Sequence, residues 1–356
     1  MINLTQSKIM QNWGTDNSDV PLVSVSCITY NHEPYIAQAL DGFLMQKTNF
    51  PFEVIVHDDA STDRTAEIIR KYEARFPKII KPIYETENQY SKRDDSLGRI
   101  MDAACKGKNI AFCDGDDYWT DENKLQMQVD FLEGNPEYGL CYTDYNTYNQ
   151  QNGAMRYDLF KSGENKLSEE ILLSDWIFLK GYIAPMTWVY RKSVLKNYKS
   201  LHSLDGTFEM VAYFLYASKI KCLAPTTAVY RQLAESASHS RNINKVYARA
   251  KSLFETQLSL IDKYISEDID VLKKNIEDQY YTSNFFLFAA VGDNLSLKNV
   301  LENYRIRFAK RLLARFVRLE LGRRIFAVIY VARRNLKNAI AIRKKYYKND
   351  RGGAIT

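Results

Sequence analysis

The order of apolar segments between residues 21 and 143 is the feature that most restricts how this chain can fold. Short apolar runs rich in β-branched residues alternate there with segments in which apolar residues recur at helical spacing. This alternation is typical of β-α-β units around a mostly parallel sheet, and it predicts an α/β fold. The predicted strands cover 22–29, 52–57, 79–84 and 109–113, and the predicted helices begin near Pro34, after 58–63, before 109 and near Asp121.

Acidic residues follow two of these predicted strands directly. Asp58 and Asp59 come after the second strand, and Asp114, Asp116 and Asp117 come after the fourth. The carboxyl ends of parallel strands meet at one edge of a sheet, which is where ligands bind in such folds. Negative charges this close repel one another, and a divalent cation that carries the phosphates of a ligand would relieve the repulsion. A D-x-D spacing also occurs in many solvated turns, so it needs support from the rest of the chain.

The composition is that of a globular protein with room for two domains, or for one large domain and an appendage. The chain has 356 residues, 46% of them hydrophobic. Its five cysteines are scattered and form no C-x-x-C pair, which argues against a disulfide framework or a thiolate zinc site and favours a reducing compartment. Residues 1–19 lack the features of a secretory signal, and the apolar run 325–332 is far short of the roughly 20 residues that cross a bilayer. We therefore expect a cytoplasmic protein.

Three motifs in the α/β part resemble those of the family 2 glycosyltransferases, which have the GT-A fold. They are Val23–Asn31, Glu53–Asp63 and Phe112–Trp119, in this order and at intervals similar to those of the family. The resemblance implies a GT-A catalytic domain over 21–240, preceded by an N-terminal extension over 1–20. Residues 241–356 are predicted to form a helical C-terminal region with a basic amphipathic tail.

The resemblance also implies that these motifs bind a nucleotide-sugar donor, with a UDP-sugar favoured. A carboxylate accepts hydrogen bonds from a base N–H or from ribose hydroxyls, and an aromatic ring can cover the face of a base. The alternative for Asp58 and Asp59 is that they cap the next helix. The predicted donor-binding residues are Thr29, Tyr30, Asn31, Glu33, Asp58, Asp59, Asn88, Arg99, Asp114 and Gly115.

A divalent metal is the cofactor that the resemblance implies. Asp116 is the expected direct ligand, and Asp114 is expected nearer the ribose and the water shell of the metal. Hard oxygen ligands favour Mg²⁺ or Mn²⁺. Gly115 would let the turn approach the phosphates closely. His239 is a further candidate ligand of metal or phosphate, with a solvated loop histidine as the alternative.

Inverting transfer also needs a base that takes the proton of the acceptor hydroxyl. The family has an acid at the start of a downstream helix, and this position matches Asp205, with Glu209 as the competitor. The alternative for Asp205 is an ordinary helix cap. Residues 176–191, rich in aromatic side chains, are expected either to contact the acceptor or to lie in the core.

The function implied is transfer of a sugar to a hydroxyl of a glycan or lipid-linked acceptor in capsule, lipopolysaccharide or other surface-polysaccharide synthesis. One rival is a sugar-nucleotide nucleotidyltransferase, which would typically have a Gly-rich basic loop after the first strand, and residues 29–33 do not form one. A second rival is a non-catalytic protein that binds nucleotide sugars or nucleic acid. That protein would bind metal and donor without turnover.

The C-terminal segment 303–351 carries the positive charge of the chain. It contains 16 Lys or Arg and two acids, so its net charge is +14. Because the net charge of the whole chain is +6, the remainder carries −8. Around Phe308 its apolar and basic residues occupy adjoining arcs of a helical wheel, which favours an anionic membrane surface as partner, at the inner face of the cell membrane. The alternative is that its apolar half packs on the rest of the protein. No base-reading motif accompanies the charge, so nucleic acid is not the expected partner.

Overall fold

A computed structural model describes residues 4–14, 20–163, 170–179, 181–233 and 242–304 of the chain. The chain divides into two compact units, Met1–Ala234 and Glu235–Thr356, which we describe separately. The basic segment after residue 304 and His239 lie outside the described residues. Within the described residues, no helix combines the length and apolar character needed to cross a membrane.

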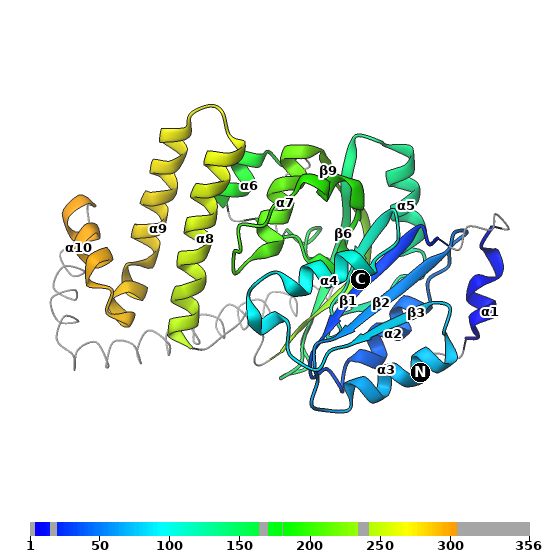
Figure 1. The fold of residues 1–356 in the computed structure, drawn as a ribbon. Coiled ribbons are helices and arrows are strands. Elements are labelled where there is room, and N and C mark those ends of the chain that lie inside the picture. The colour runs from blue at the N-terminus through cyan, green and yellow to red at the C-terminus, as the bar shows by residue number, and fades with distance from the viewer. Residues whose placement is uncertain (1–3, 15–19, 164–169, 180, 234–241, 305–356) are drawn as a thin grey trace, which may run out of the picture. The chain divides into compact units, whose positions relative to one another are not determined.

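The first unit is built on a mixed sheet with the strand order β3-β2-β1-β4-β8-β6-β9-β5, and β7 pairs with β6 (Figure 1). Its parallel half consists of β1 (Val23–Thr29), β2 (Phe52–Asp58), β3 (Ile80–Tyr84) and β4 (Asn109–Phe112). These strands lie within a residue or two of the predicted ones, so the α/β prediction is confirmed. Strands β1 and β2 are buried along almost their whole length, as expected for a parallel sheet covered on both faces.

The other half of the sheet mixes parallel and antiparallel pairs. It contains β5 (Tyr118–Trp119), β6 (Tyr138–Asn149), β7 (Met155–Arg156), β8 (Val189–Arg191) and β9 (Lys219–Gln232). Strand β8 runs antiparallel to β4 and β6, whereas β6 and β9 run parallel. Because β5 pairs antiparallel with β9, the acidic segment after β4 is held against a strand that lies about a hundred residues further along the chain.

The helices of the first unit connect and cover these strands. They are α1 (Gln6–Ile9), α2 (Ile36–Leu44), α3 (Thr65–Arg75), α4 (Ser96–Ala104), α5 (Lys124–Gly134), α6 (Leu173–Leu179) and α7 (Gly206–Ala217), with short 3-10 turns at Met10–Asn12, Tyr90–Lys92, Pro185–Thr187 and Lys192–Asn197. The predicted apolar face of α2 is buried, with Leu40 and Phe43 fully inaccessible to solvent. Burial of a side chain of this size contributes about 2 kcal/mol, which fixes α2 on the sheet.

The second unit contains α8 (Ile243–Tyr264), α9 (Ile269–Val291) and α10 (Asn294–Asn303). The Phe254 and Tyr280 rings stack at 4.1 Å between α8 and α9, and Phe288 and Val300 are buried between α9 and α10. Gly292, with φ of 79°, ends α9 in the left-handed conformation that glycine adopts at little cost. The predicted helical character of the region after residue 240 therefore extends at least to Asn303.

Candidate functional site

The turns that follow β1, β2 and β4 meet at one edge of the sheet. The Asp59 N–H donates to the Thr29 carbonyl at 2.9 Å, and the Gly115 N–H donates to the Ile28 carbonyl at 2.9 Å. Each acidic turn is thus bonded to the last residues of β1. The structure brings the two turns together on either side of this strand end.

Gly115 permits the close approach of the second turn to β1. A Cβ atom at this position would lie 2.7 Å from Thr29 Oγ1 and 3.0 Å from His32 Nδ1. Such contacts are shorter than real Cβ atoms tolerate, so any other residue would push the turn away from β1. The observed reason for the glycine is this packing, in addition to the predicted approach to phosphates.

The carboxylate of Asp59 is buried and has protein partners. Its Oδ1 accepts from the Gln89 N–H at 2.6 Å and its Oδ2 accepts from the Tyr90 N–H at 3.1 Å. Asn88 Nδ2 donates to the Asp59 carbonyl at 3.1 Å. The two predicted donor-binding residues Asp59 and Asn88 therefore lie together, and Asp59 holds the loop between β3 and α4 beside the turn after β2.

Asn31 and Glu33 join the turn after β1 to the start of α3. Asn31 has φ of 54°, a left-handed conformation that Asn adopts more readily than most residues, and its Oδ1 accepts from the Thr62 N–H at 2.8 Å. Glu33 Oε1 accepts from Arg64 Nε at 2.8 Å, and this hydrogen bonding lowers the pKa of Glu33. Both residues thus organise the turns around the predicted site.

Three buried polar atoms at this edge have no hydrogen-bond partner within the described residues. They are Thr29 Oγ1, His32 Nδ1 and Asp58 Oδ1. A buried polar group without a partner is costly, so such groups indicate a place where a ligand, ion or water completes the bonding. Desolvation lowers the pKa of His32, while the charges of Asp116, Asp63 and Asp58 oppose the shift. His32 therefore lies among the acidic residues of both turns. The sequence analysis did not select it, although it directly follows the Thr-Tyr-Asn motif.

The carboxylates of the second turn are largely unpaired. Within the described residues, no hydrogen bond or ion pair reaches the side chain of Asp114 or of Asp116. Asp114 is exposed to solvent and Asp116 is partly buried. Desolvation and the charge of Asp116 raise the pKa of Asp114 above its usual range. Desolvation and Asp116 also raise the pKa of Asp117 well above its usual range, although the Arg231 N–H donates to its Oδ1 at 2.7 Å.

The aromatic residues near the predicted donor and acceptor sites divide between the core and the surface. Trp119 is buried, its Nε1 donates to the Met186 carbonyl at 2.8 Å and its ring packs edge-on against Phe43. Trp176 and Trp188 are also buried, so the core alternative holds for these two residues of the predicted acceptor segment. Tyr30 remains 44% exposed and can offer its ring to a ligand.

Asp205 lies at the N-cap position of α7, without a side-chain hydrogen bond to a main-chain N–H of the helix. The Thr207 hydroxyl donates to Asp205 Oδ1 at 3.5 Å. Glu209, the competing base, is buried, and its Oε1 accepts hydrogen bonds from the Tyr198 hydroxyl and, at 2.9 Å, from the Leu201 N–H. Its Oε2 has no hydrogen-bond partner within the described residues. Tyr182 is 39% exposed and its pKa is raised by desolvation first and also by the charges of Asp117 and Asp205.

The described contacts do not connect Arg99 to the acidic turns, and the described residues include only two of the predicted metal ligands, Asp114 and Asp116. Arg99 donates from Nη1 to the Asp94 carbonyl at 2.8 Å, and no described contact joins it to the acidic turns. Nor do the described parts of the chain gather three His, Cys, Asp or Glu side chains into a group arranged to hold a metal ion. Asp114 and Asp116 offer hard oxygen ligands without protein partners among the described residues, which fits a divalent cation. The third predicted ligand, His239, lies outside the described residues.

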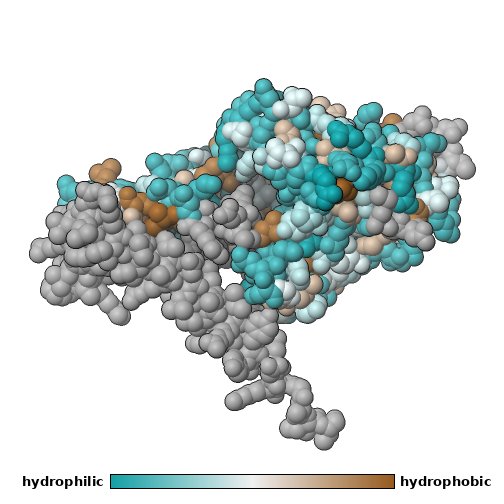
Figure 2. All heavy atoms as spheres, turned by 90° about the horizontal axis from the view of Figure 1, so that it is seen from below, coloured by the Kyte–Doolittle hydropathy of each residue, from teal (hydrophilic) through white to brown (hydrophobic). Residues whose placement is uncertain are grey.

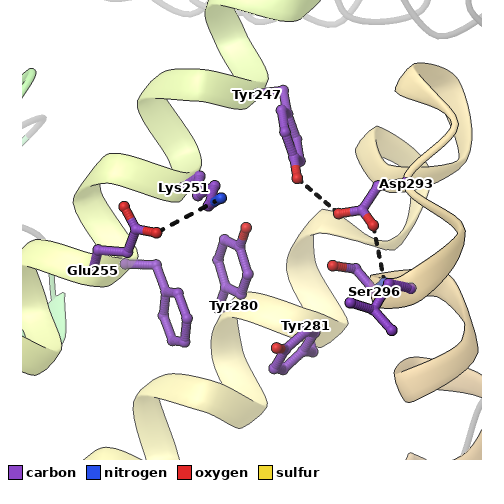
Figure 3. A pocket seen from close by; sticks show the side chains of 9 residues that line it. Tyr247, Lys251, Glu255, Tyr280, Tyr281, Asp293 and Ser296 are labelled. Atoms are coloured by element: carbon purple, nitrogen blue, oxygen red, sulfur yellow. Dashed lines mark hydrogen bonds and ion pairs between the residues drawn. The ribbon is translucent and has the colours of Figure 1, made fainter.

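A separate hollow lies in the helical unit (Figure 3). It has a volume of about 240 Å³ between α8, α9 and α10, with aromatic side chains such as Tyr247 and Tyr281 in its wall. Its acid Asp293 already accepts from the Tyr247 hydroxyl at 2.7 Å and caps α10 through the Ser296 N–H at 3.0 Å. No residue of the acidic turns lines this hollow, so we place the chemistry at the sheet edge. On the face shown in Figure 2, hydrophobic residues form small separate patches.

Structures of TarS and of a mannosyltransferase have a fold similar to that of this chain. Residues 1–349 of Staphylococcus aureus TarS in complex with UDP align with a TM-score of 0.52 and 19% identity, covering 92% of this chain and 91% of that one. The mannosyltransferase PcManGT of Pyrobaculum calidifontis in complex with GDP-Man and Mn²⁺ aligns with a TM-score of 0.52 and 18% identity, covering 91% of this chain and 89% of that one. The first unit therefore has the GT-A fold.

Sequence comparisons define the family. Residues 24–199 match the model described as glycosyl transferase family 2. The chain is 34% identical over 243 residues to an uncharacterised protein of Mycobacterium tuberculosis, covering 66% of this chain and 64% of the relative. It is 26% identical over 292 residues to the S. aureus poly(ribitol-phosphate) beta-N-acetylglucosaminyltransferase TarS, covering 79% of this chain and 47% of the relative. Residues 24–199, just under half of the chain, therefore belong to the glycosyl transferase family 2. The chain spans slightly less than two thirds of the mycobacterial relative and about half of TarS.

Proposed function

We propose that this protein is a metal-dependent inverting glycosyltransferase. It would move a sugar from a nucleoside-diphosphate sugar to a hydroxyl of a glycan or lipid-linked acceptor in surface-polysaccharide synthesis. The observation that carries the proposal is the meeting of two acidic turns at the end of β1, where Asp114 and Asp116 have no protein partner within the described residues. Two neighbouring carboxylates without protein partners repel each other, and a cation bound to both would relieve that repulsion.

The nucleoside part of the donor would bind between the turns after β1 and β2. Tyr30 would offer its exposed ring to the base, and Asp59 and Asn88, which lie together, would contact the same nucleoside. The unpartnered atoms Thr29 Oγ1 and Asp58 Oδ1 are available to polar groups of the donor. TarS has been crystallised with UDP and with UDP-GlcNAc, and the Pyrobaculum enzyme with GDP-Man, which supports a nucleotide-sugar donor.

The metal would be Mn²⁺ or Mg²⁺, held by Asp116 with Asp114, and with His239 as a further ligand. When bound, such an ion stabilises the negative charge that collects on the departing nucleoside diphosphate. These two metal ligands suit a hard cation, because both carboxylates have oxygen atoms to which no described residue is bonded. The Mn²⁺ in the Pyrobaculum complex supports this choice.

Asp205 would act as the general base. Its carboxylate takes the proton from the acceptor hydroxyl while that oxygen attacks the anomeric carbon from the side opposite the leaving diphosphate, which inverts the configuration. One observation supports Asp205 over Glu209: Glu209 is buried, and its Oε1 accepts hydrogen bonds from Tyr198 and Leu201. Glu209 then serves to hold the chain before α7 in place.

The acceptor is proposed from the name of a relative, and the place of action is proposed from the charge of the C-terminal segment. The printed name of TarS describes transfer of N-acetylglucosamine to poly(ribitol-phosphate), which supports a surface glycan as the product class. The basic segment 303–351 would attract the protein to anionic lipid at the cytoplasmic face of the membrane, where lipid-linked acceptors are available. Co-sedimentation with anionic liposomes tests this, and equal partition of the full chain and of residues 1–304 into the supernatant would contradict it.

The proposed reaction is tested by incubating the full-length protein with Mn²⁺ and a panel of UDP-, GDP- and dTDP-sugars and measuring the release of nucleoside diphosphate. We expect release from one donor class, enhanced by an acceptor and abolished by chelation of the metal. Binding of metal and donor without any release, for every donor and acceptor tried, would favour the non-catalytic alternative. Formation of a nucleotide sugar from a sugar phosphate and a nucleoside triphosphate would favour the nucleotidyltransferase.

A further inference from the structure

Arg231 is buried beside the acidic turn and uses every nitrogen of its side chain. It lies on β9 and is 6% exposed. Its Nε donates to the Asp116 carbonyl at 2.7 Å, Nη1 to Gln150 Oε1 at 2.9 Å and Nη2 to Gln38 Oε1 at 2.6 Å. The guanidinium thus joins the turn after β4 to α2 and to the chain after β6.

The backbone also aligns Arg231 with the turn. In the antiparallel pair of β5 and β9, Tyr118 lies opposite Val229, and the same register two residues further on brings Asp116 opposite Arg231. The Arg231 N–H donates to Asp117 Oδ1 at 2.7 Å. Main chain and side chain of Arg231 therefore both bind the acidic turn.

Aromatic rings fix the orientation of the guanidinium. Its Cζ lies 4.8 Å from the ring centre of Tyr35, 5.1 Å from that of Tyr118 and 5.7 Å from that of Tyr148. Contacts of this kind are favourable for a cation over an aromatic face. Together with the hydrogen bonds they leave the side chain one orientation, in which Nε points at the turn.

The bond from Arg231 to Asp116 goes to the carbonyl, not to the carboxylate. Arg231 thereby fixes the backbone of the turn and brings a positive charge close to three acids, while the side-chain oxygens of Asp114 and Asp116 stay available. An arginine that formed an ion pair with Asp116 would instead compete with a metal ion. This arrangement is what a preorganised metal ligand requires, because the supporting bonds hold the ligand without using its ligating atoms.

We propose that Arg231 is a positioning residue that holds the Asp114–Asp117 turn in the conformation that binds a divalent metal with a nucleoside diphosphate. The inference rests on the proposed function for the identity of the ligand. The sequence alone does not indicate this role of Arg231, because the role depends on partners that are distant along the chain, Gln38 and Asp116 among them.

The test compares Arg231→Lys and Arg231→Met with the wild type in the full-length protein. Lysine keeps the charge but cannot donate in three fixed directions, and methionine loses both charge and donors. We measure the dissociation constant of Mn²⁺ by electron paramagnetic resonance with UDP and with GDP present, and the melting temperature of each variant. Loss of a residue that supports a metal ligand typically weakens metal binding about 10–100-fold, and we expect this loss in both variants, the larger one for methionine.

Arg191 is the matched control. It is an arginine of the same sheet with 13% side-chain exposure, and its Nε donates to the Tyr138 carbonyl at 3.1 Å, at the far end of β4 from the acidic turn. Arg191→Met is expected to lower the melting temperature and to leave the Mn²⁺ affinity within about twofold of the wild type. Gln38→Ala removes one partner of Arg231 and is expected to weaken Mn²⁺ binding less than Arg231→Lys.

The outcomes separate this inference from the proposed function. Wild-type Mn²⁺ affinity in folded Arg231→Lys, or equal weakening by Arg191→Met and Arg231→Met, would overturn the positioning role and leave the glycosyltransferase proposal intact. Weakened binding specific to the Arg231 variants supports the role even if no sugar is transferred. Absence of Mn²⁺ binding by the wild type with either nucleotide would overturn both.

Discussion

The two acidic turns of the α/β unit look alike in sequence and differ in how their charge is compensated. After β2, Asp59 accepts two main-chain N–H groups and Asp63 accepts the Thr65 N–H at 2.9 Å and the Glu33 N–H at 3.0 Å. After β4, neither Asp114 nor Asp116 has a side-chain partner within the described residues. The protein itself provides hydrogen bonds to Asp59 and Asp63 in the first turn, whereas Asp114 and Asp116 in the second turn remain able to bind a ligand.

This difference separates a structural carboxylate from a functional one. A carboxylate that accepts hydrogen bonds from the protein stabilises the fold and changes little when a ligand arrives. A carboxylate that lies beside another acid and has no protein partner destabilises the fold slightly, and a bound cation removes this destabilisation. Substitutions in the two turns should therefore affect stability and activity in opposite proportions.

The largest expected effect is that of Asp116→Asn on transfer. Loss of the direct ligand should lower the rate by about 1,000-fold, because a metal contributes several kcal/mol to stabilising the leaving group. The free energy of unfolding should not fall, since the substitution removes like-charge repulsion with Asp114. The rate of nucleoside diphosphate release and a urea titration measure both. A variant that is unstable yet retains its rate would reverse the assignment of the two turns.

Asp205→Asn should lower transfer by about 100-fold or more while donor binding is retained, in line with the usual contribution of a general base. The asparagine keeps the size of the side chain but cannot take a proton. Steady-state rates with the donor identified in the panel, together with donor affinity by calorimetry, provide the measurement. Glu209→Gln is the control, expected to change the melting temperature more than the rate. Near-normal turnover of Asp205→Asn would rule out the assignment.

Asp59→Ala should act mainly on stability. It removes two hydrogen bonds from main-chain N–H groups to a buried carboxylate, and the free energy of unfolding should fall by about 3 kcal/mol. The loop that carries Asn88 and Tyr90 should loosen, which would raise the KM for the donor. Chemical denaturation and hydrogen exchange of the Gln89 and Tyr90 amides would reveal this. Unchanged exchange at both amides would mean that Asp59 does not hold the loop.

Lys124→Met examines whether a buried lysine of α5, which lies outside both acidic turns, loses its proton in the folded protein. Lys124 is buried on α5, its Nζ donates to Gln128 Oε1 at 2.6 Å, and desolvation lowers its pKa to about 7. Unfolded Lys124 keeps its proton up to about pH 10.4, so between about pH 7 and 10 the unfolded state binds more protons and stability rises with pH.

The stability of the wild type should therefore increase relative to Lys124→Met by up to about 1 kcal/mol per pH unit above pH 7. Urea titrations of both proteins from pH 7 to 9 give this difference. Parallel stability curves would show that Lys124 stays protonated in the folded state.

Much of the fold follows from local sequence patterns, and the division of roles within the site does not. The parallel strands and the buried face of α2 are readable because their apolar residues recur at short, regular spacing. The second half of the sheet depends on pairings such as β5 with β9, which no local pattern encodes. The positions of Asp59 and Asp116 after their strands could be predicted, but which carboxylate has partners depends on the distant Gln89 and Tyr90 amides. The roles of His32 and Arg231 likewise appear only once the chain is folded.

The most direct test of the account is a calorimetric titration of Mn²⁺ into the full-length protein in the presence of UDP or GDP. We expect one ion to bind per chain with a nucleotide present, binding to be lost in Asp116→Asn, and binding to persist in Asp63→Asn, an acid of the first turn. Equal Mn²⁺ binding by the wild type and Asp116→Asn, or loss of binding only when the first turn is altered, would contradict the account.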